Sequence, residues 1–131
     1  MPISKESPAV AIARAHVEAW SNQDFDRARN SLAPDVHVTV TTCQPVMAPT
    51  DTTGVDVYMD GLIKFAQAVV PGSLRVIDSL GDERNALLLL TMKAAFDPSG
   101  PKFTLTASRL YLLDENDKIK VEQVIFFVTP T

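Results

Sequence analysis

The chain has 131 residues, of which 46% are hydrophobic and 21% are charged, and its net charge is −4. This is the composition of a globular protein, and we expect a single domain over residues 1–131. The negative net charge argues against nucleic acid or an anionic membrane as the main partner. No apolar run is long enough to span a bilayer, and the single cysteine excludes an internal disulfide framework. Because the N-terminal segment MPISKESPAV also lacks the continuous apolar stretch of a secretory signal, we expect a cytoplasmic protein.

The first predicted element is a helix. Ser7 followed by Pro8 is a typical start, because the serine oxygen can accept a hydrogen bond from an early backbone N–H and proline at the first helical position loses none. Apolar residues then recur at three- and four-residue spacing as far as about Ser21, which indicates a helix lying on a core. His16 falls inside this apolar stripe, so it is either a satisfied core residue or a functional group.

A shorter helix and a strand follow. Asp24 can cap the helix, and Pro34 predicts its end at Ala33, since proline disfavours helical geometry in the residue before it. In residues 36–41, three valines alternate with a histidine and two threonines, which is the period of a half-buried strand. The valines, including Val40, should face the core, and the histidine should face solvent or a subunit contact.

A loop and a third helix come next. Residues 42–53 contain two prolines and several turn formers, which predicts a loop that could act as a lid or rim, with Met47 as its apolar plug. The third helix is predicted over residues 55–70, where a Pro-Gly pair stops it. Gly61 lies in the middle of this helix at a cost of about 1 kcal/mol relative to alanine, so we expect another segment to approach closely there.

The second half of the chain is predicted to consist of strands. Residues 73–80 and 86–96 form the first two, separated by a short turn. A hairpin of two long strands follows over residues 102–113 and 118–128, joined by the turn-forming residues 114–117. The predicted order of elements is α-α-β-α-β-β-β-β, which is an α+β arrangement.

The hairpin brings two charged side chains together. If Leu113 and Lys118 close the turn, antiparallel pairing puts Arg109 directly opposite Glu122. The opposite face, to which Ile119 is assigned, also carries large apolar groups. A hairpin with two apolar faces needs two covers, so we expect helices on one side and a partner chain or a second layer on the other. The other residues predicted to share the face of Arg109 and Glu122 are Leu105, Ala107, Tyr111, Lys120, Val124 and Phe126.

Two stretches of the chain resemble a known superfamily. They are HVEAWSNQDFDRARNSLAPDVHV in residues 16–38 and DENDKIKVEQV in residues 114–124, and they are similar to the nuclear-transport-factor-2-like superfamily. That superfamily includes SnoaL-type polyketide cyclases, ketosteroid isomerases and limonene-type epoxide hydrolases. The resemblance implies a cystatin-like cone roll, with three helices packed on a strongly curved, mixed and mostly antiparallel sheet. It also implies an apolar pocket under the first and third helices, and homodimers formed through the outer face of the sheet.

The resemblance also constrains the chemistry. Compared with the ketosteroid isomerases, His16 stands where that family has an oxyanion-holding tyrosine, Val40 replaces the proton-shuttling aspartate, and Arg109 replaces a second acid. Ordinary steroid isomerisation is therefore not expected. Arg109 and Glu122 resemble half of the acid–arginine–acid arrangement of the epoxide hydrolases, with Tyr111 where a second acid is expected. The SnoaL-type cyclases use one acid of the pocket for an aldol closure, and Glu122 could be that acid here.

The catalytic candidates are therefore Glu122, Arg109 and His16. If the carboxylate and the guanidinium line the pocket, burial raises the pKa of Glu122 while Arg109 lowers it, which leaves a group able to exchange a proton. In the competing interpretation, the two form a cross-strand ion pair on an exposed face and do no chemistry. His16 could polarise a substrate oxygen, because its ordinary pKa is near neutrality.

Further residues are expected to wall the pocket. Aromatic and apolar side chains can bury a small hydrophobic ligand, although aromatics at helical spacing are more often core residues. No metal site, glycine-rich phosphate loop or nucleophile elbow is legible in the sequence, and Cys43 has no motif around it, so we expect no cofactor. The predicted substrate-binding residues are Trp20, Val40, Met47, Tyr58, Tyr111, Val124 and Phe126.

Two functions remain open from the sequence. One is a cofactor-independent isomerase, cyclase or hydrolase that acts on a small hydrophobic molecule such as a polyketide-like, terpenoid or steroid-like compound. The other is a non-catalytic, dimeric ligand-binding or interaction module of the same fold. The location of Arg109 and Glu122 distinguishes them, since an enzyme needs both groups on the wall of an accessible pocket.

Overall fold

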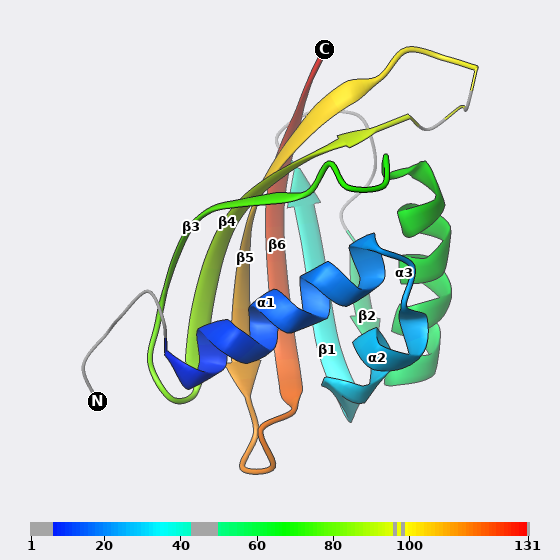
Figure 1. Cartoon of the computed structure of the whole chain (residues 1–131). Coiled ribbons are helices and arrows are strands. Elements are labelled where there is room, and N and C mark those ends of the chain that lie inside the picture. Colours follow the sequence, from blue (N-terminus) through cyan, green and yellow to red (C-terminus); the bar gives the residue numbers. More distant parts are fainter. Residues whose placement is uncertain (1–6, 43–49, 96, 98, 131) are drawn as a thin grey trace.

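Three helices lie on one face of a curved, six-stranded sheet in the computed structural model, which describes residues 7–42, 50–95, 97 and 99–130 (Figure 1). The strand order is β2-β1-β6-β5-β4-β3, and β1 runs parallel to β6 while the other neighbours are antiparallel. The predicted α+β class with a mixed, mostly antiparallel sheet is confirmed. The elements are α1 (Pro8–Ser21), α2 (Phe25–Asn30), β1 (Leu32–Thr42), β2 (Thr50–Thr53), α3 (Val55–Ala68), β3 (Arg75–Gly81), β4 (Asn85–Ala94), β5 (Phe103–Leu113) and β6 (Ile119–Pro130).

The helix starts follow the predicted capping chemistry. The Ser7 hydroxyl accepts a hydrogen bond from the backbone N–H of Val10 at 3.2 Å, and the Asp24 carboxylate accepts one from the backbone N–H of Arg27 at 3.3 Å. The end of α2 was predicted too late: the helix stops at Asn30, because the chain enters β1 at Leu32. The first strand begins four residues earlier than predicted, at Leu32 rather than at residue 36, and the remaining predicted boundaries agree to within two residues.

A short strand lies inside the region predicted as a loop. Residues Thr50–Thr53 form β2, which pairs antiparallel with β1 at the edge of the sheet. Its sequence, TDTT, is polar and shows no apolar alternation, so the periodicity of the sequence could not reveal it. Met47, the predicted plug of the loop, and Cys43 lie outside the described residues.

The hairpin register differs from the predicted one by two residues. Arg109 lies opposite Val124, and Tyr111 lies opposite Glu122. An irregularity between Leu112 and Leu113 shifts the pairing near the turn, and it also turns the fully buried Ile119 to the core rather than to the outer face. Because side chains alternate with a period of two, the shift leaves Arg109 and Glu122 on the predicted face.

The two faces of the sheet have different surroundings. Figure 1 shows α1 running across the inner face, with α3 beside the edge formed by β1 and β2. The outer face exposes large apolar side chains on three of its strands. None of the described helices is long and apolar enough to cross a membrane. The exposed side chains on the outer face are Ile77, Leu80, Leu87, Leu89, Ile125 and Phe127.

Candidate active site

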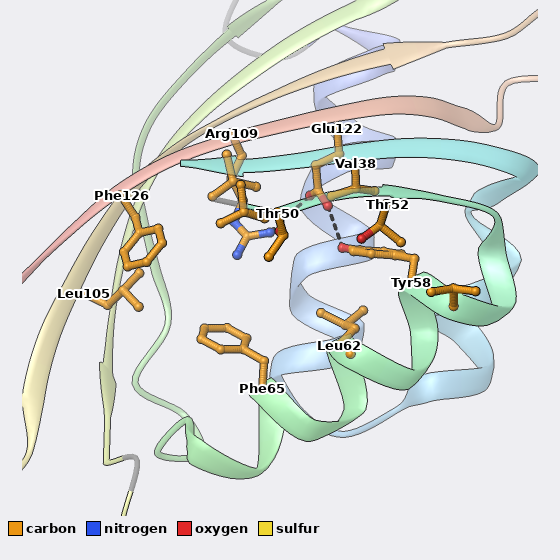
Figure 2. A pocket seen from close by; sticks show the side chains of 14 residues that line it. Val38, Thr50, Thr52, Tyr58, Leu62, Phe65, Leu105, Arg109, Glu122 and Phe126 are labelled. Atoms are coloured by element: carbon orange, nitrogen blue, oxygen red, sulfur yellow. Dashed lines mark hydrogen bonds and ion pairs between the residues drawn. The ribbon is translucent and has the colours of Figure 1, made fainter. Parts of the chain in front are cut away.

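A pocket of about 260 Å³ lies between α3 and the inner face of the sheet (Figure 2). Its wall is mostly apolar, and no residue of α1 contributes to it, although the resemblance implied a pocket under the first helix as well as the third. Two threonines, one tyrosine, one arginine and one glutamate provide the polar groups. The lining residues are Val38, Val40, Thr50, Thr52, Val57, Tyr58, Gly61, Leu62, Phe65, Leu105, Arg109, Glu122, Val124 and Phe126.

One side of helix α3 lines this pocket. Val57, Gly61 and Phe65 recur every four residues and therefore lie on one side of the helix. The expected close approach at Gly61 is wrong, because a Cβ placed there would meet no atom within 4 Å. The missing side chain instead leaves open space at the rim of the pocket, between the two larger side chains.

A fully buried carboxylate forms the polar centre of the pocket. Glu122 has no exposed surface, and its two oxygens accept hydrogen bonds from different partners. The Tyr58 hydroxyl donates to Oε1 at 2.5 Å, and Arg109 donates from Nη1 to Oε2 at 3.1 Å (Figure 2). Arg109 and Glu122 are diagonal neighbours on adjacent strands and form a buried ion pair, with side chains 6% and 0% exposed. The exposed cross-strand pair of the competing interpretation is therefore not what the structure contains.

The environment of Glu122 keeps it ionised. Burial raises the pKa of its carboxyl group, but Arg109, followed by His16 and the two neighbouring tyrosines, lowers it by more, so the pKa lies below its ordinary value. Burial and the charge of Glu122 raise the pKa values of Tyr58 and Tyr111 well above that of free tyrosine. At neutral pH the pocket therefore holds a carboxylate, a guanidinium and the uncharged phenol of Tyr58, and Glu122 can accept a proton.

Arg109 is held in place from two sides. Its guanidinium carbon lies 5.1 Å from the centre of the Trp20 ring, which is a cation–π contact, and its Nη1 binds Glu122. A guanidinium has five N–H donors, and within the described residues only one atom of this group makes a hydrogen bond. Figure 2 shows the guanidinium reaching into the pocket, and because Nε is buried, the donors that a ligand could meet are those on the terminal nitrogens.

His16 does not fit its predicted role as a donor to a substrate oxygen. Its Nδ1 lies 3.0 Å from the carbonyl oxygen of Ala28, and a carbonyl only accepts, so Nδ1 carries the proton. Burial lowers the pKa of the imidazole, although Glu122 opposes the shift, and the ring is therefore neutral at neutral pH. Its Nε2, which has no hydrogen-bond partner within the described residues, is an acceptor.

The other predicted site residues divide into two groups. Tyr58 lines the pocket, as do Val40, Val124 and Phe126, whereas Trp20 and Tyr111 are fully buried outside its lining. Tyr111 contacts the His16 ring edge to face, with the ring centres 6.2 Å apart. The described part of the chain contains no group of three or more His, Cys, Asp or Glu side chains that could hold a metal ion. Lining residues that the sequence did not single out are Val38, Thr50, Thr52, Val57, Leu62 and Phe65; the four-residue spacing along α3 is the signal that could have identified two of them.

The buried, neutral imidazole predicts a specific pH dependence of stability. The pKa of His16 is lower in the folded protein than its ordinary value of 6.5, so the unfolded chain binds a proton that the folded protein does not. The contribution of His16 to the free energy of unfolding is therefore complete above about pH 6.5 and decreases as the pH falls below it. We expect His16→Gln to flatten this decrease in urea titrations at a series of pH values. An unchanged profile for His16→Gln would show that the histidine is not held neutral.

The amino-acid sequence matches the model of a known protein family. Residues 13–122 match the sequence model of the SnoaL-like domain. The chain belongs to the SnoaL-like family. This match covers most of the chain, from within α1 to Glu122 in β6, and it confirms the resemblance to the nuclear-transport-factor-2-like superfamily. A search of curated protein sequences gives no match.

Solved structures of similar fold come from several bacteria. An LEH-like epoxide hydrolase of Mycobacterium tuberculosis superimposes on this SnoaL-like domain with a TM-score of 0.70 and 17% identity, over 92% of this chain and 83% of that one. Another Mycobacterium tuberculosis protein, in complex with estradiol-17β-hemisuccinate, gives a TM-score of 0.75 and 13% identity over 91% and 93%. A Catenulispora acidiphila protein with a ketosteroid isomerase-like fold, in complex with trimethylamine, gives 0.69 and 12% over 91% and 85%. At these identities the likeness establishes the fold alone.

Proposed function

We propose that this SnoaL-like protein binds a small, mainly apolar molecule in its pocket and converts it by acid/base chemistry without a cofactor. The observation that carries the proposal is a fully buried, ionised Glu122 on the wall of a mostly apolar pocket. Leaving a charged group in such a place is costly unless it is paired and hydrogen-bonded, and here two partners hold it. Strongly perturbed titratable groups in a concave pocket are typical of functional sites.

In this proposal Glu122 accepts a proton from the bound molecule. Tyr58 and Arg109 fix the orientation of the carboxylate, and the low dielectric of the pocket strengthens their effect on charge that develops during the reaction. Isomerisation, ring closure and hydrolysis all use a positioned base of this kind. The similar folds of an LEH-like epoxide hydrolase and of a protein in complex with a steroid ester are consistent with an apolar substrate.

A non-catalytic binding module is the second candidate, and one observation favours it. Both oxygens of Glu122 already accept hydrogen bonds, and its lowered pKa makes it a weaker base than a free glutamate. In that case the ion pair with Arg109 would fix the shape of the pocket and take no part in a reaction. The two candidates share the ligand pocket and differ only in whether the bound molecule is converted.

Blocking the pocket tests the part of the proposal that both candidates share. Gly61 borders the pocket and has open space around it, so Gly61→Trp should fold and project an indole across the opening. We expect this variant to reduce the affinity for any small apolar ligand by at least about tenfold, because the ligand loses most of its buried contact area. Lys64→Trp, one turn further along α3 and outside the lining, is the matched control and should bind normally. Equal affinities of the two variants would place the binding site elsewhere.

We also propose that the protein forms a homodimer through the outer face of its sheet. Ile125 and Phe127 on β6 are 56% and 48% exposed, and exposed leucines on β3 and β4 lie on the same face of the sheet, on the other side of β5. Several large apolar side chains exposed on one face are typical of a protein–protein contact. A cytoplasmic location remains a prediction from the sequence.

Charge placed on this face should disrupt the dimer. In analytical ultracentrifugation we expect the wild type to sediment as a dimer and Ile125→Glu to shift toward monomer, because dimerisation would bury an unpaired carboxylate. Lys64→Glu, on the exposed side of α3, should leave the association state unchanged. A monomeric wild type, or a dimer unaffected by Ile125→Glu, would rule out this interface.

A further inference from the structure

At the charged end of the pocket, Arg109 has hydrogen-bond donors without a partner among the residues that the structure describes, whereas the oxygens of Glu122 are already bonded. Glu122 is completely buried, and each of its oxygens already accepts a hydrogen bond. Nη1 of the Arg109 guanidinium binds this carboxylate and Nε is buried without a hydrogen-bond partner within the described residues, which leaves Nη2 as the nitrogen whose donors face the pocket. The group best placed to meet a polar atom of a ligand is therefore an N–H donor, and its natural partner is an oxygen that accepts a hydrogen bond.

We infer that the ligand of this pocket is a compact, at most bicyclic, apolar molecule that carries one uncharged acceptor oxygen, such as a ketone, lactone or ester carbonyl, and that Arg109 binds this oxygen. This inference rests on the proposed ligand-binding function and specifies the chemical class of the ligand. It also transfers to Arg109 the contact with a ligand oxygen that the sequence assigned to His16. His16 has no N–H directed to a ligand, because its only proton is used for the Ala28 carbonyl.

Charge balance explains why the acceptor should be uncharged. Arg109 and Glu122 neutralise each other, so a ligand carbonyl adds no net charge to the buried site. A ligand carboxylate would instead bring a second negative charge beside Glu122 in a low-dielectric pocket. Two carboxylates in one site cannot both remain ionised without a large cost, so such a ligand would have to bind together with a proton.

The dimensions of the pocket limit the size of the apolar part. Its volume of about 260 Å³ is slightly below the range of roughly 300–1,000 Å³ that is typical for sites of drug-sized ligands. Figure 2 shows the rings of Phe65 and Phe126, with Leu105, around the space in front of the guanidinium. A ring system placed there contacts apolar walls while an oxygen at its edge reaches Arg109.

Three probes with the same bicyclic skeleton test the inference. They are 1-tetralone, which has the carbonyl; tetralin, which lacks it; and tetralin-1-carboxylate, which is anionic at neutral pH. Dissociation constants are measured by NMR titration for the wild type and for the double variant Arg109→Gln/Glu122→Gln. The double variant removes the guanidinium without leaving an unpaired buried charge, and its fold is checked by circular dichroism.

We expect the wild type to bind 1-tetralone about tenfold more tightly than tetralin, because a hydrogen bond from a charged donor distinguishes the two. The double variant should bind both equally. The carboxylate should bind more weakly than the ketone, and its affinity should increase at lower pH as a proton is taken up.

The possible failures are distinguishable. Equal affinities of the wild type for ketone and hydrocarbon, or tightest binding of the carboxylate at neutral pH, would overturn the inference and leave the proposed pocket function standing. A ketone preference that persists in the double variant would also overturn it, because another group would then hold the oxygen. If the wild type binds none of the three probes, the pocket is not a site for such molecules, and both the inference and the proposed function fail.

Discussion

Glu122→Gln is expected to reduce the turnover of any compound that this protein converts by about 10²–10⁴-fold, the usual contribution of a positioned acid/base group. Glutamine has nearly the shape of glutamate and can still accept a hydrogen bond from Tyr58 or Arg109, but its amide does not take up a proton at neutral pH. Substrate affinity should change much less than turnover, because most of the pocket wall is apolar and stays in place. Single-turnover kinetics and a separate binding titration measure the two effects.

This experiment needs a correction for folding and a matched control. Turnover is expressed per folded molecule, since the substitution also affects stability, and the folded fraction is read from circular dichroism. Thr52→Val is the control, because it removes a hydroxyl from the pocket lining without touching the ion pair. Turnover of Glu122→Gln within tenfold of the wild type would exclude Glu122 as the base and favour the non-catalytic binding module.

The second large effect concerns stability. Either Arg109→Gln or Glu122→Gln alone should lower the free energy of unfolding by about 3–5 kcal/mol, because each leaves an unpaired charge in the interior. The double variant should lose much less free energy of unfolding than the sum of the two single losses. It leaves no unpaired charge, because two uncharged amides replace an ion pair whose charges cancel. Urea denaturation of the four proteins of this cycle gives the coupling between the two residues.

The exposed ion pair of Arg29 and Asp56 provides the comparison. Its side chains are 46% and 83% exposed, so solvent screens their attraction, and the same substitutions there should give a much smaller coupling than at Arg109 and Glu122. If the buried pair shows no larger coupling than the exposed pair, the two side chains do not meet in a buried site. The proposed function would then lose the feature on which it depends.

Much of the architecture could be predicted because local chemistry specifies it. Ser7 and Asp24 cap the helices as their hydrogen-bonding capacity predicts, and the valines of β1 face inward as their alternation predicts. The faces assigned to Arg109 and Glu122 were also correct even though the register was not, whereas Ile119, beside the irregularity, was assigned to the wrong face. Register depends on the irregularity between Leu112 and Leu113, which no periodic pattern reports, whereas the assignment to a face survives any shift by two residues.

The site was less accessible to sequence reasoning because it is made by contacts between distant segments. Arg109 and Glu122 were predicted to be close, but the hydrogen bond from Tyr58, 64 residues before Glu122, has no signal in the sequence. The sequence does not distinguish a glycine that faces open space, as Gly61 does, from a glycine that another segment approaches closely. The proton position on His16 depends on the Ala28 carbonyl, which only the packing of α1 against α2 places beside it.

A crystal structure of the protein in complex with 1-tetralone tests the central claim most directly. We predict the bicyclic ring between Phe65 and the inner face of the sheet, with the ketone oxygen at hydrogen-bond distance from the Arg109 guanidinium and the Arg109–Glu122 pair intact. A pocket filled by protein side chains, or a ligand bound on the outer face of the sheet, would contradict the account.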